Sequence, residues 1–95
     1  MKLVEVYPSD RPDKKYTAKF VIDGKVKLIH FGAKGYEDYT THKDKKRRDQ
    51  YRARHAKDNL SDLMSPGALS WYILWGDSTD LQTNVRSFRR RFNNL

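Results

Sequence analysis

The chain has 95 residues, which suits one domain with a single hydrophobic core, and it carries 20 Lys or Arg against 12 Asp or Glu, a net charge of +8. It has no cysteine, which excludes disulfides, iron–sulfur clusters, cysteine-ligated zinc and thiol nucleophiles. We therefore predict a single basic domain over residues 1–95, and we expect neither a secretion signal nor insertion into a membrane because long apolar runs are absent.

The first third of the chain has the composition of β-strands. Residues 3–7 are β-prone and end at a proline, where a run of turn-forming residues begins. Two further β-prone runs, residues 16–22 and 25–31, are separated by the dipeptide Asp23-Gly24. This dipeptide readily supplies the two positive φ angles of a two-residue type I′ turn, so we predict a β-hairpin.

A two-residue turn fixes the register of the hairpin and therefore the composition of its two faces. In this register Tyr16 lies opposite Phe31, and Val21 lies opposite Val26. The predicted core face consists of Tyr16, Ala18, Phe20, Ile22, Ile29 and Phe31. The other, partly apolar face consists of Lys15, Thr17, Lys19, Val21, Val26, Leu28 and His30. Together with residues 3–7, the pattern predicts an antiparallel hairpin or a three-stranded sheet.

Two helices are predicted between the sheet and the C-terminal segment. The first covers residues 43–57, and either Thr40 or Thr41 would cap its N-terminus. The second begins at Ser65-Pro66 and stops at Gly76, because Ser is a good cap, Pro suits the first helical position and Gly ends helices. It is apolar nearly all round, so we expect it at the centre of the core, including its aromatic residues Trp71, Tyr72 and Trp75.

A third helix is predicted at the C-terminal end of the chain. It opens with Thr79-Asp80-Leu81-Gln82, which matches the capping-box pattern. The apolar residues at helical spacing are Leu81, Val85, Phe88 and Phe92. The predicted fold class is therefore α+β, with an antiparallel hairpin or three-stranded sheet followed by three α-helices in one small domain.

The positive charge is concentrated in the first helix. Residues 43–57 contain eight Lys or Arg and two Asp or Glu, which supply +6 of the net +8. Apolar residues are few there, so the helix has little to bury. Each phosphate that such a helix neutralises releases counterions, which favours binding to nucleic acid. An acidic protein surface, or simple solvation of the charges, would also suit this composition.

The residues predicted to contact nucleic acid fall into three sets. The main phosphate contacts are expected on the cationic helix, at Lys45, Lys46, Arg47, Arg48, Arg52, Arg54 and Lys57. A secondary set on the last helix consists of Arg86, Arg89 and Arg90. The candidates for stacking on bases are Tyr36, Tyr39 and Tyr51. If the two cationic helices lie side by side they would form a groove for a phosphate backbone, and if they lie apart the protein would bridge two segments.

No pattern in the chain predicts catalysis, and we expect neither a metal nor a cofactor. The loop at residues 32–35 has two glycines but lacks the spacing of a phosphate-binding loop. His30, His42 and His55 lack the spacing of zinc ligands, and the serines lack the context of a nucleophile. The protein is therefore expected to be non-enzymatic.

Several segments resemble a family of small basic proteins from large DNA viruses of algae and protists, classed as a domain of unknown function. They are residues 30–40, 42–44, 65–70, 73–75 and 88–92, with Arg47-Arg48, Tyr51-Arg52 and Arg54-His55. The resemblance spans roughly residues 14–92 and supplies no site residues. It implies an intracellular protein of an infected cell, with packaging in the virion as an option.

This context suits two classes of function. In the first, the protein binds nucleic acid, DNA more than RNA, without reading its sequence, and coats, condenses or packages viral DNA. In the alternative, it is a small structural or minor capsid-type component that contacts other virion proteins. A sequence-specific accessory factor is a third, minor option. Salt would separate the first two, because binding to phosphates weakens steeply as salt rises.

Overall fold

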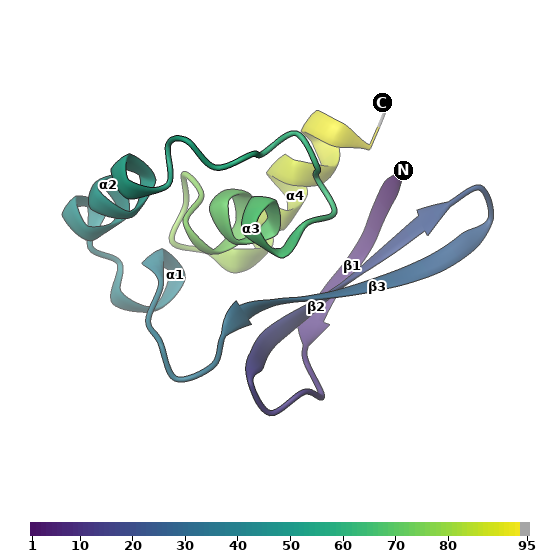
Figure 1. Ribbon diagram of the computed structural model, residues 1–95, viewed down its shortest axis with the longest axis horizontal. Coiled ribbons are helices and arrows are strands. Elements are labelled where there is room, and N and C mark those ends of the chain that lie inside the picture. The colour runs from purple at the N-terminus through teal and green to yellow at the C-terminus, as the bar shows by residue number, and fades with distance from the viewer. Residues whose placement is uncertain (94–95) are drawn as a thin grey trace.

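The computed structural model describes residues 1–93, which form a three-stranded antiparallel sheet with helices packed on one face (Figure 1). The strands are β1 (Lys2–Pro8), β2 (Lys14–Ile22) and β3 (Lys25–Ala33), and the helices are α1 (Tyr39–His42), α2 (Lys45–Arg54), α3 (Pro66–Leu69), the π-helix η1 (Ser70–Leu74) that continues α3, and α4 (Leu81–Phe92). This arrangement confirms the predicted α+β fold class, and the sheet takes the three-stranded form.

The hairpin of β2 and β3 has the predicted turn and register. Asp23 and Gly24 have φ angles of 52° and 76°, as a type I′ turn requires. Tyr16 pairs with Phe31, and the pairing continues in step along both strands. Strand β1 then adds to the free edge of β2, so the order is β1-β2-β3.

The core lies between the sheet and the helices. It contains Leu3, Val6, Ala18, Phe20, Phe31, Leu69, Ile73, Leu74, Val85 and Phe88, all of them buried. Three of these belong to the predicted core face of the hairpin, which is therefore confirmed. Three more come from α3–η1, the helix that we expected at the centre, and two come from α4. The opposite face of the sheet carries no helix in Figure 1, and Val26 and Leu28 on it are 59% and 48% exposed.

The cationic helix is shorter than the sequence predicts. Residues 43–57 were expected to be helical throughout, but Lys43 has a left-handed φ of 58° and Asp44 is the N-cap of α2. The Asp44 side chain accepts hydrogen bonds from the backbone N–H groups of Lys46 and Arg47, at 2.9 and 3.3 Å. The helix ends at Arg54, so Lys57 lies in the following turn. The first turn of the predicted helix is lost because an Asp cap competes with it.

A short helix, α1, lies between the sheet and α2, in a segment where no helix was predicted. Its N-cap is Asp38, and Thr40 and Thr41 lie inside α1, so neither of them caps α2. Asp38 accepts a hydrogen bond from the Thr40 N–H at 2.9 Å, and the Thr41 hydroxyl accepts one from the Asp38 N–H at 2.9 Å. The buried Asp38 carboxylate also pairs with Lys15 at 2.7 Å, which ties α1 to the sheet.

Helix α3 starts as predicted, and its continuation widens into the π-helix η1. The Ser65 hydroxyl accepts a hydrogen bond from the Ala68 N–H, and Pro66 occupies the first turn. At the end of η1 the Trp75 N–H donates to the Ser70 carbonyl at 3.0 Å, a π-type span. The buried Asn84 side chain donates to the Ile73 carbonyl at 2.9 Å, a group that the end of the helix would otherwise leave unpaired.

Helix α4 closes the domain. Its N-cap is Asp80, one residue later than the capping-box pattern starting at Thr79 predicts, and Asp80 accepts a hydrogen bond from the Thr83 N–H. A hydrogen bond from the Thr83 hydroxyl, followed by that from the Thr83 N–H, lowers the pKa of Asp80. At the other end, the Asn93 amide donates to the Leu3 carbonyl and accepts from the Leu3 N–H, at 3.0 and 2.9 Å. The last turn of α4 is thereby fastened to β1.

Two glycines offer a matched test of the turn after η1. A Cβ at Gly76 would collide with the Tyr72 carbonyl oxygen and lie 2.8 Å from Asn84 Cγ, whereas a Cβ at Gly67 meets nothing within 4 Å. We expect Gly76→Ala to lower the free energy of unfolding by about 1–3 kcal/mol through overpacking. Gly67→Ala, inside α3, should raise it by about 0.4–1 kcal/mol. Urea denaturation followed by circular dichroism measures both, and equal effects would contradict the role of Gly76.

Candidate nucleic-acid interface

Helix α2 is held to the domain by an aromatic stack. It has ten residues and buries none of them fully, so it would be marginal in isolation. The Tyr51 ring lies parallel to Trp75, with centroids 4.1 Å apart and planes at 3°. The His55 ring also stacks on Tyr51, at 4.2 Å. Because two rings this close cannot share one face, Tyr51 is enclosed between them.

Two of the predicted phosphate contacts point inward. Arg52 Nε donates to the Trp75 carbonyl at 3.0 Å, and Arg48 Nη1 donates to the Gly76 carbonyl at 3.4 Å. Both guanidinium groups also pair with Asp77, at 3.3 and 3.7 Å. The Arg48 and Arg52 side chains are 12% and 27% exposed. These arginines therefore join α2 to the turn that follows η1, a use that their charge alone did not predict.

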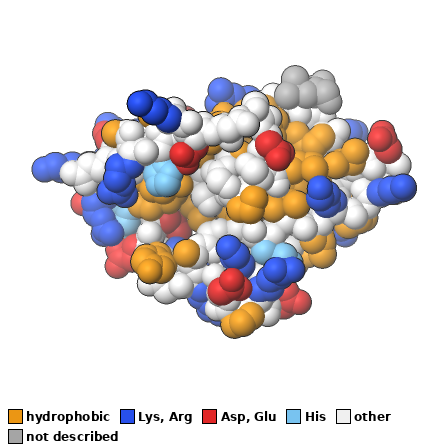
Figure 2. All heavy atoms as spheres, viewed as in Figure 1, with side chains coloured by type: hydrophobic (Ala, Val, Ile, Leu, Met, Phe, Trp, Pro, Cys, Tyr) orange, Lys and Arg blue, Asp and Glu red, His pale blue; other side chains and the backbone are white. Residues whose placement is uncertain are grey.

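The other predicted cations of this set are exposed. They are Lys45, Lys46, Arg47, Arg54 and Lys57. Lys45 pairs with Asp49 at 3.2 Å, and Arg47 pairs with Glu37 at 3.1 Å, but each pair stands in solvent and contributes little. The hydrogen bond from Lys45, followed by that from Arg48, lowers the pKa of Asp49. Figure 2 shows Lys and Arg side chains gathered over the α2 end of the molecule.

The structure brings several predicted residues together around one cavity. It has a volume of about 410 Å³, lies between α2 and the loop after β3, and is lined by Tyr36, Arg47, Tyr51 and Arg54 with Lys15 and Trp75 among others. Its two carboxylates, Glu37 and Asp38, are paired with Arg47 and Lys15. We call this space the α2 cavity. It combines cations with an aromatic wall, a combination that suits a phosphate and its attached base.

The three predicted stacking tyrosines differ in exposure. Tyr36 is 75% exposed and presents its ring to solvent at the α2 cavity. Tyr39 is buried, with 9% of its surface exposed, and the Arg48 guanidinium lies 5.2 Å above its ring. Tyr51 is enclosed by Trp75 and His55. Of the three, Tyr36 is the ring that an incoming base can reach without a rearrangement.

The secondary set lies on another flank of the molecule. Arg86, Arg89 and Arg90 are exposed on α4, whereas Val85 and Phe88 are buried. Helix α3–η1 stands between α2 and α4 in Figure 1. The two cationic helices therefore do not lie side by side, and the groove predicted for that arrangement does not form.

One cation of α4 was missed by the sequence analysis. Arg91 is exposed, and its guanidinium lies 5.4 Å above the Tyr72 ring, on the side of α4 that faces η1. The signal that would have found it is helical spacing, since Asn84, Ser87 and Arg91 recur at three and four residues and line the same hollow.

Within residues 1–93, no group of three or more His, Cys, Asp or Glu side chains is placed to hold a metal ion. The helices of the same residues include none with the length and apolar character needed to cross a membrane. The single buried side-chain atom without a partner there is His42 Nε2.

Comparison with known proteins identifies the family. A model described as a family of unknown function, DUF5754, matches residues 4–55, more than half of the chain. The chain belongs to this family. The DUF5754 match runs from β1 to the residue after α2, so it includes Tyr36, Arg47 and Arg54 and stops before α3. No curated protein and no solved structure matches the chain significantly.

The inward role of two arginines can be tested by stability. We expect Arg48→Ala and Arg52→Ala each to lower the free energy of unfolding by about 1–3 kcal/mol, because each leaves a backbone carbonyl without its charged donor and removes one of the two arginines paired with Asp77. Lys46→Ala removes the same charge from an exposed position and should change it by less than about 0.5 kcal/mol. Denaturant titration of the three variants decides, and a destabilised Lys46→Ala would contradict the assignment.

The enclosure of Tyr51 predicts a pH effect. Burial, with a smaller contribution from the Asp58 charge, raises the pKa of the Tyr51 phenol above its ordinary value of 10.0. The protonated phenol thus stabilises the folded state fully below pH 10 and progressively less as the pH rises through the raised pKa. The difference between phenolate absorbance titrations of the wild type and of Tyr51→Phe should have a midpoint above pH 10. A midpoint at or below pH 10 would show that the Tyr51 ring is exposed to solvent and would contradict its enclosure.

Proposed function

We propose that the protein binds nucleic acid, DNA in preference to RNA, without reading sequence, through the exposed cations of α2. The single observation that carries this proposal is that α2 uses different residues for attachment to the domain and for its exposed positive charge. Tyr51, Arg48 and Arg52 attach it to the domain, while Lys45, Lys46, Arg47 and Arg54 are exposed and make no buried contact. A cationic face that the fold does not use is suited to phosphates.

The α2 cavity supports the same function. Arg47 and Arg54 stand on one of its walls and Tyr36 on the loop opposite, so a phosphate on the arginines leaves its sugar and base near an exposed ring. The exposed ion pairs of Lys45 and Arg47 contribute little, so exchanging Asp49 or Glu37 for a phosphate carries a small cost. The resemblance to small basic proteins of large DNA viruses supports coating, condensing or packaging of viral DNA in an infected cell.

One observation favours the alternative of a structural virion component. The outer face of the sheet exposes Val4, Val26 and Leu28 at 44%, 59% and 48%. Apolar side chains grouped on a sheet face suit a protein–protein contact. The affinity of such a contact would be largely insensitive to salt, whereas binding to phosphates through α2 would weaken as salt rises.

Binding to a duplex of arbitrary sequence provides the test. In fluorescence anisotropy, the wild type should lose affinity steeply as salt rises. Lys46→Ala, Arg47→Ala and Arg54→Ala combined should weaken binding and reduce the slope of log affinity against log salt by about 2–3, close to 0.9 for each lost phosphate contact. Arg48 and Arg52 are left unchanged because they hold the helix.

The matched control removes three exposed lysines elsewhere. Lys2→Ala, Lys25→Ala and Lys27→Ala combined also lower the net charge by three, but the strand register places these exposed residues at the hairpin end of the sheet. That end of the sheet lies far from α2 in Figure 1. The control should keep most of the affinity and the slope. Equal losses in the two triple variants, or no binding to DNA or RNA at low salt, would refute the proposal.

A further inference from the structure

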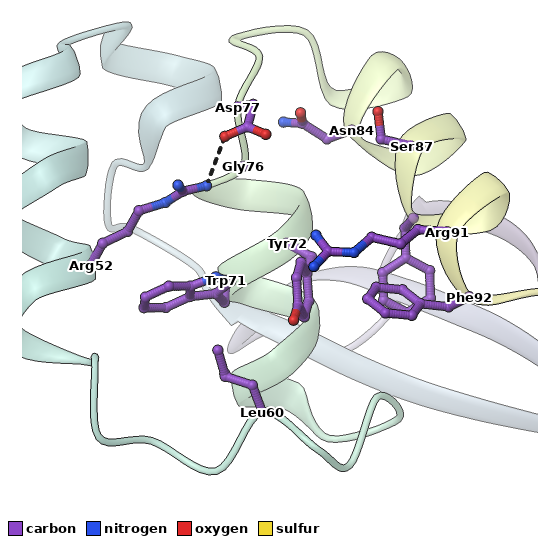
Figure 3. A pocket seen from close by; sticks show the side chains of 11 residues that line it. Arg52, Leu60, Trp71, Tyr72, Gly76, Asp77, Asn84, Ser87, Arg91 and Phe92 are labelled. Atoms are coloured by element: carbon purple, nitrogen blue, oxygen red, sulfur yellow. Dashed lines mark hydrogen bonds and ion pairs between the residues drawn. The ribbon is translucent and has the colours of Figure 1, made fainter. Parts of the chain in front are cut away.

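A second hollow lies between η1 and α4, with Arg52 of α2 at its edge. It has a volume of about 330 Å³ and is shown in Figure 3, where Trp71 and Tyr72 of η1 stand between Arg52 of α2 and Arg91 of α4. Leu60, from the segment between α2 and α3, closes its lower side in that view. We call it the η1 groove. Its size is at the lower end of the range for small-ligand pockets, which suits one flat group and excludes a duplex.

Most polar groups around the η1 groove are already paired. Arg52 donates to the Trp75 carbonyl and to Asp77, and the Asp77 carboxylate is shared with Arg48, so its charge is neutralised. The Asn84 amide donates to the carbonyls of Ile73 and Ser78. These groups therefore form the rim of the groove and already have hydrogen-bond or ion-pair partners within the protein.

Arg91 is the exception among the charged side chains of the groove. Its guanidinium lies over the rings of Tyr72 and Phe92, at 5.4 and 5.1 Å, and forms no ion pair with any residue from 1 to 93. Figure 3 shows it reaching over the groove from α4. A guanidinium held by aromatic faces keeps its N–H donors for an anion and suits a phosphate. The Ser87 hydroxyl, one turn before it, also lines the groove.

We propose that the η1 groove binds one unpaired nucleotide, with its base against Trp71 and Tyr72 and its phosphate on Arg91. This inference rests on the proposed function and extends it from nucleic acid in general to single strands. Base stacking on aromatic rings tolerates any sequence, as the proposed function requires. A paired base cannot enter, because its edge and faces are occupied in the duplex. Arg52 connects the groove to α2, so one strand can lie along the cations of α2 and place a base in the groove.

The test follows the emission of Trp71. In a Trp75→Phe background, which keeps an aromatic partner for Tyr51, Trp71 is the remaining tryptophan. A short oligothymidylate should quench its emission to saturation. Arg91→Ala should weaken binding of this strand by about tenfold, the typical effect of losing one stacked or paired contact. The matched control, Lys25→Ala, removes the same charge from an exposed position beside the hairpin turn and should change the affinity by less than about threefold.

If Trp75→Phe proves unstable, the same variants can be compared with Trp75 retained, by measuring the fluorescence anisotropy of a labelled oligothymidylate. Equal losses in Arg91→Ala and Lys25→Ala, or unchanged Trp71 emission at saturation, would overturn the groove site while α2-dependent binding keeps the proposed function. No binding of any strand or duplex would overturn both. Quenching by a peptide that ends in an aromatic residue with a free carboxylate, without a response to the oligonucleotide, would assign the groove to a protein partner and overturn the proposal.

Discussion

The stack of Tyr51 on Trp75 is the contact on which the cationic half of the structure depends. Helix α2 has no apolar stripe, so the hydrophobic burial that attaches most helices to a domain is missing. One aromatic pair replaces it, and the guanidinium groups of Arg48 and Arg52 complete the attachment through carbonyl groups at the end of η1. Since the attachment uses a single side of the helix, it also determines which cations face outward.

The end of η1 is built to receive this helix. The widened turn closes at Trp75, whose N–H reaches the Ser70 carbonyl, and the same residue offers its ring to Tyr51 and its carbonyl to Arg52. Asn84 fixes the turn from the other side by donating to the carbonyls of Ile73 and Ser78. Gly76 allows α4 to approach this closely, because a side chain there has no space. The positions of α2 and α4 are thus set by one short segment.

Local patterns in the sequence predicted the sheet better than the helices. The turn at Asp23-Gly24 fixes its own backbone angles, and the register and buried face of the hairpin then follow. Helix starts moved by one to two residues because Asp44 and Asp80 take the cap in place of nearby threonines. The order of the strands and main helices could be predicted from local sequence patterns. The additional helix α1 could not, because it depends on a buried ion pair between two residues distant in sequence, Lys15 and Asp38.

The candidate site was predicted in part. Its exposed cations and Tyr36 could be identified from composition alone, and the structure places Tyr36, Arg47 and Arg54 at one cavity. Arg48 and Arg52 could not be separated from them, because their partners are carbonyl groups more than twenty residues away. Counting charges treats every arginine as a surface cation, whereas burial and geometry decide which ones remain free.

The pair of hydrogen bonds between Leu3 and Asn93 has a consequence for folding during synthesis. During synthesis β1 to β3 leave the ribosome before α3, η1 and α4, the elements that cover the apolar face of this sheet. Until then the nascent hairpin carries an uncovered hydrophobic surface of the kind that recruits chaperones or aggregates. The two hydrogen bonds that join Asn93 to Leu3 form only once α4 has emerged, so completion of the core waits for the C-terminal turn of that helix.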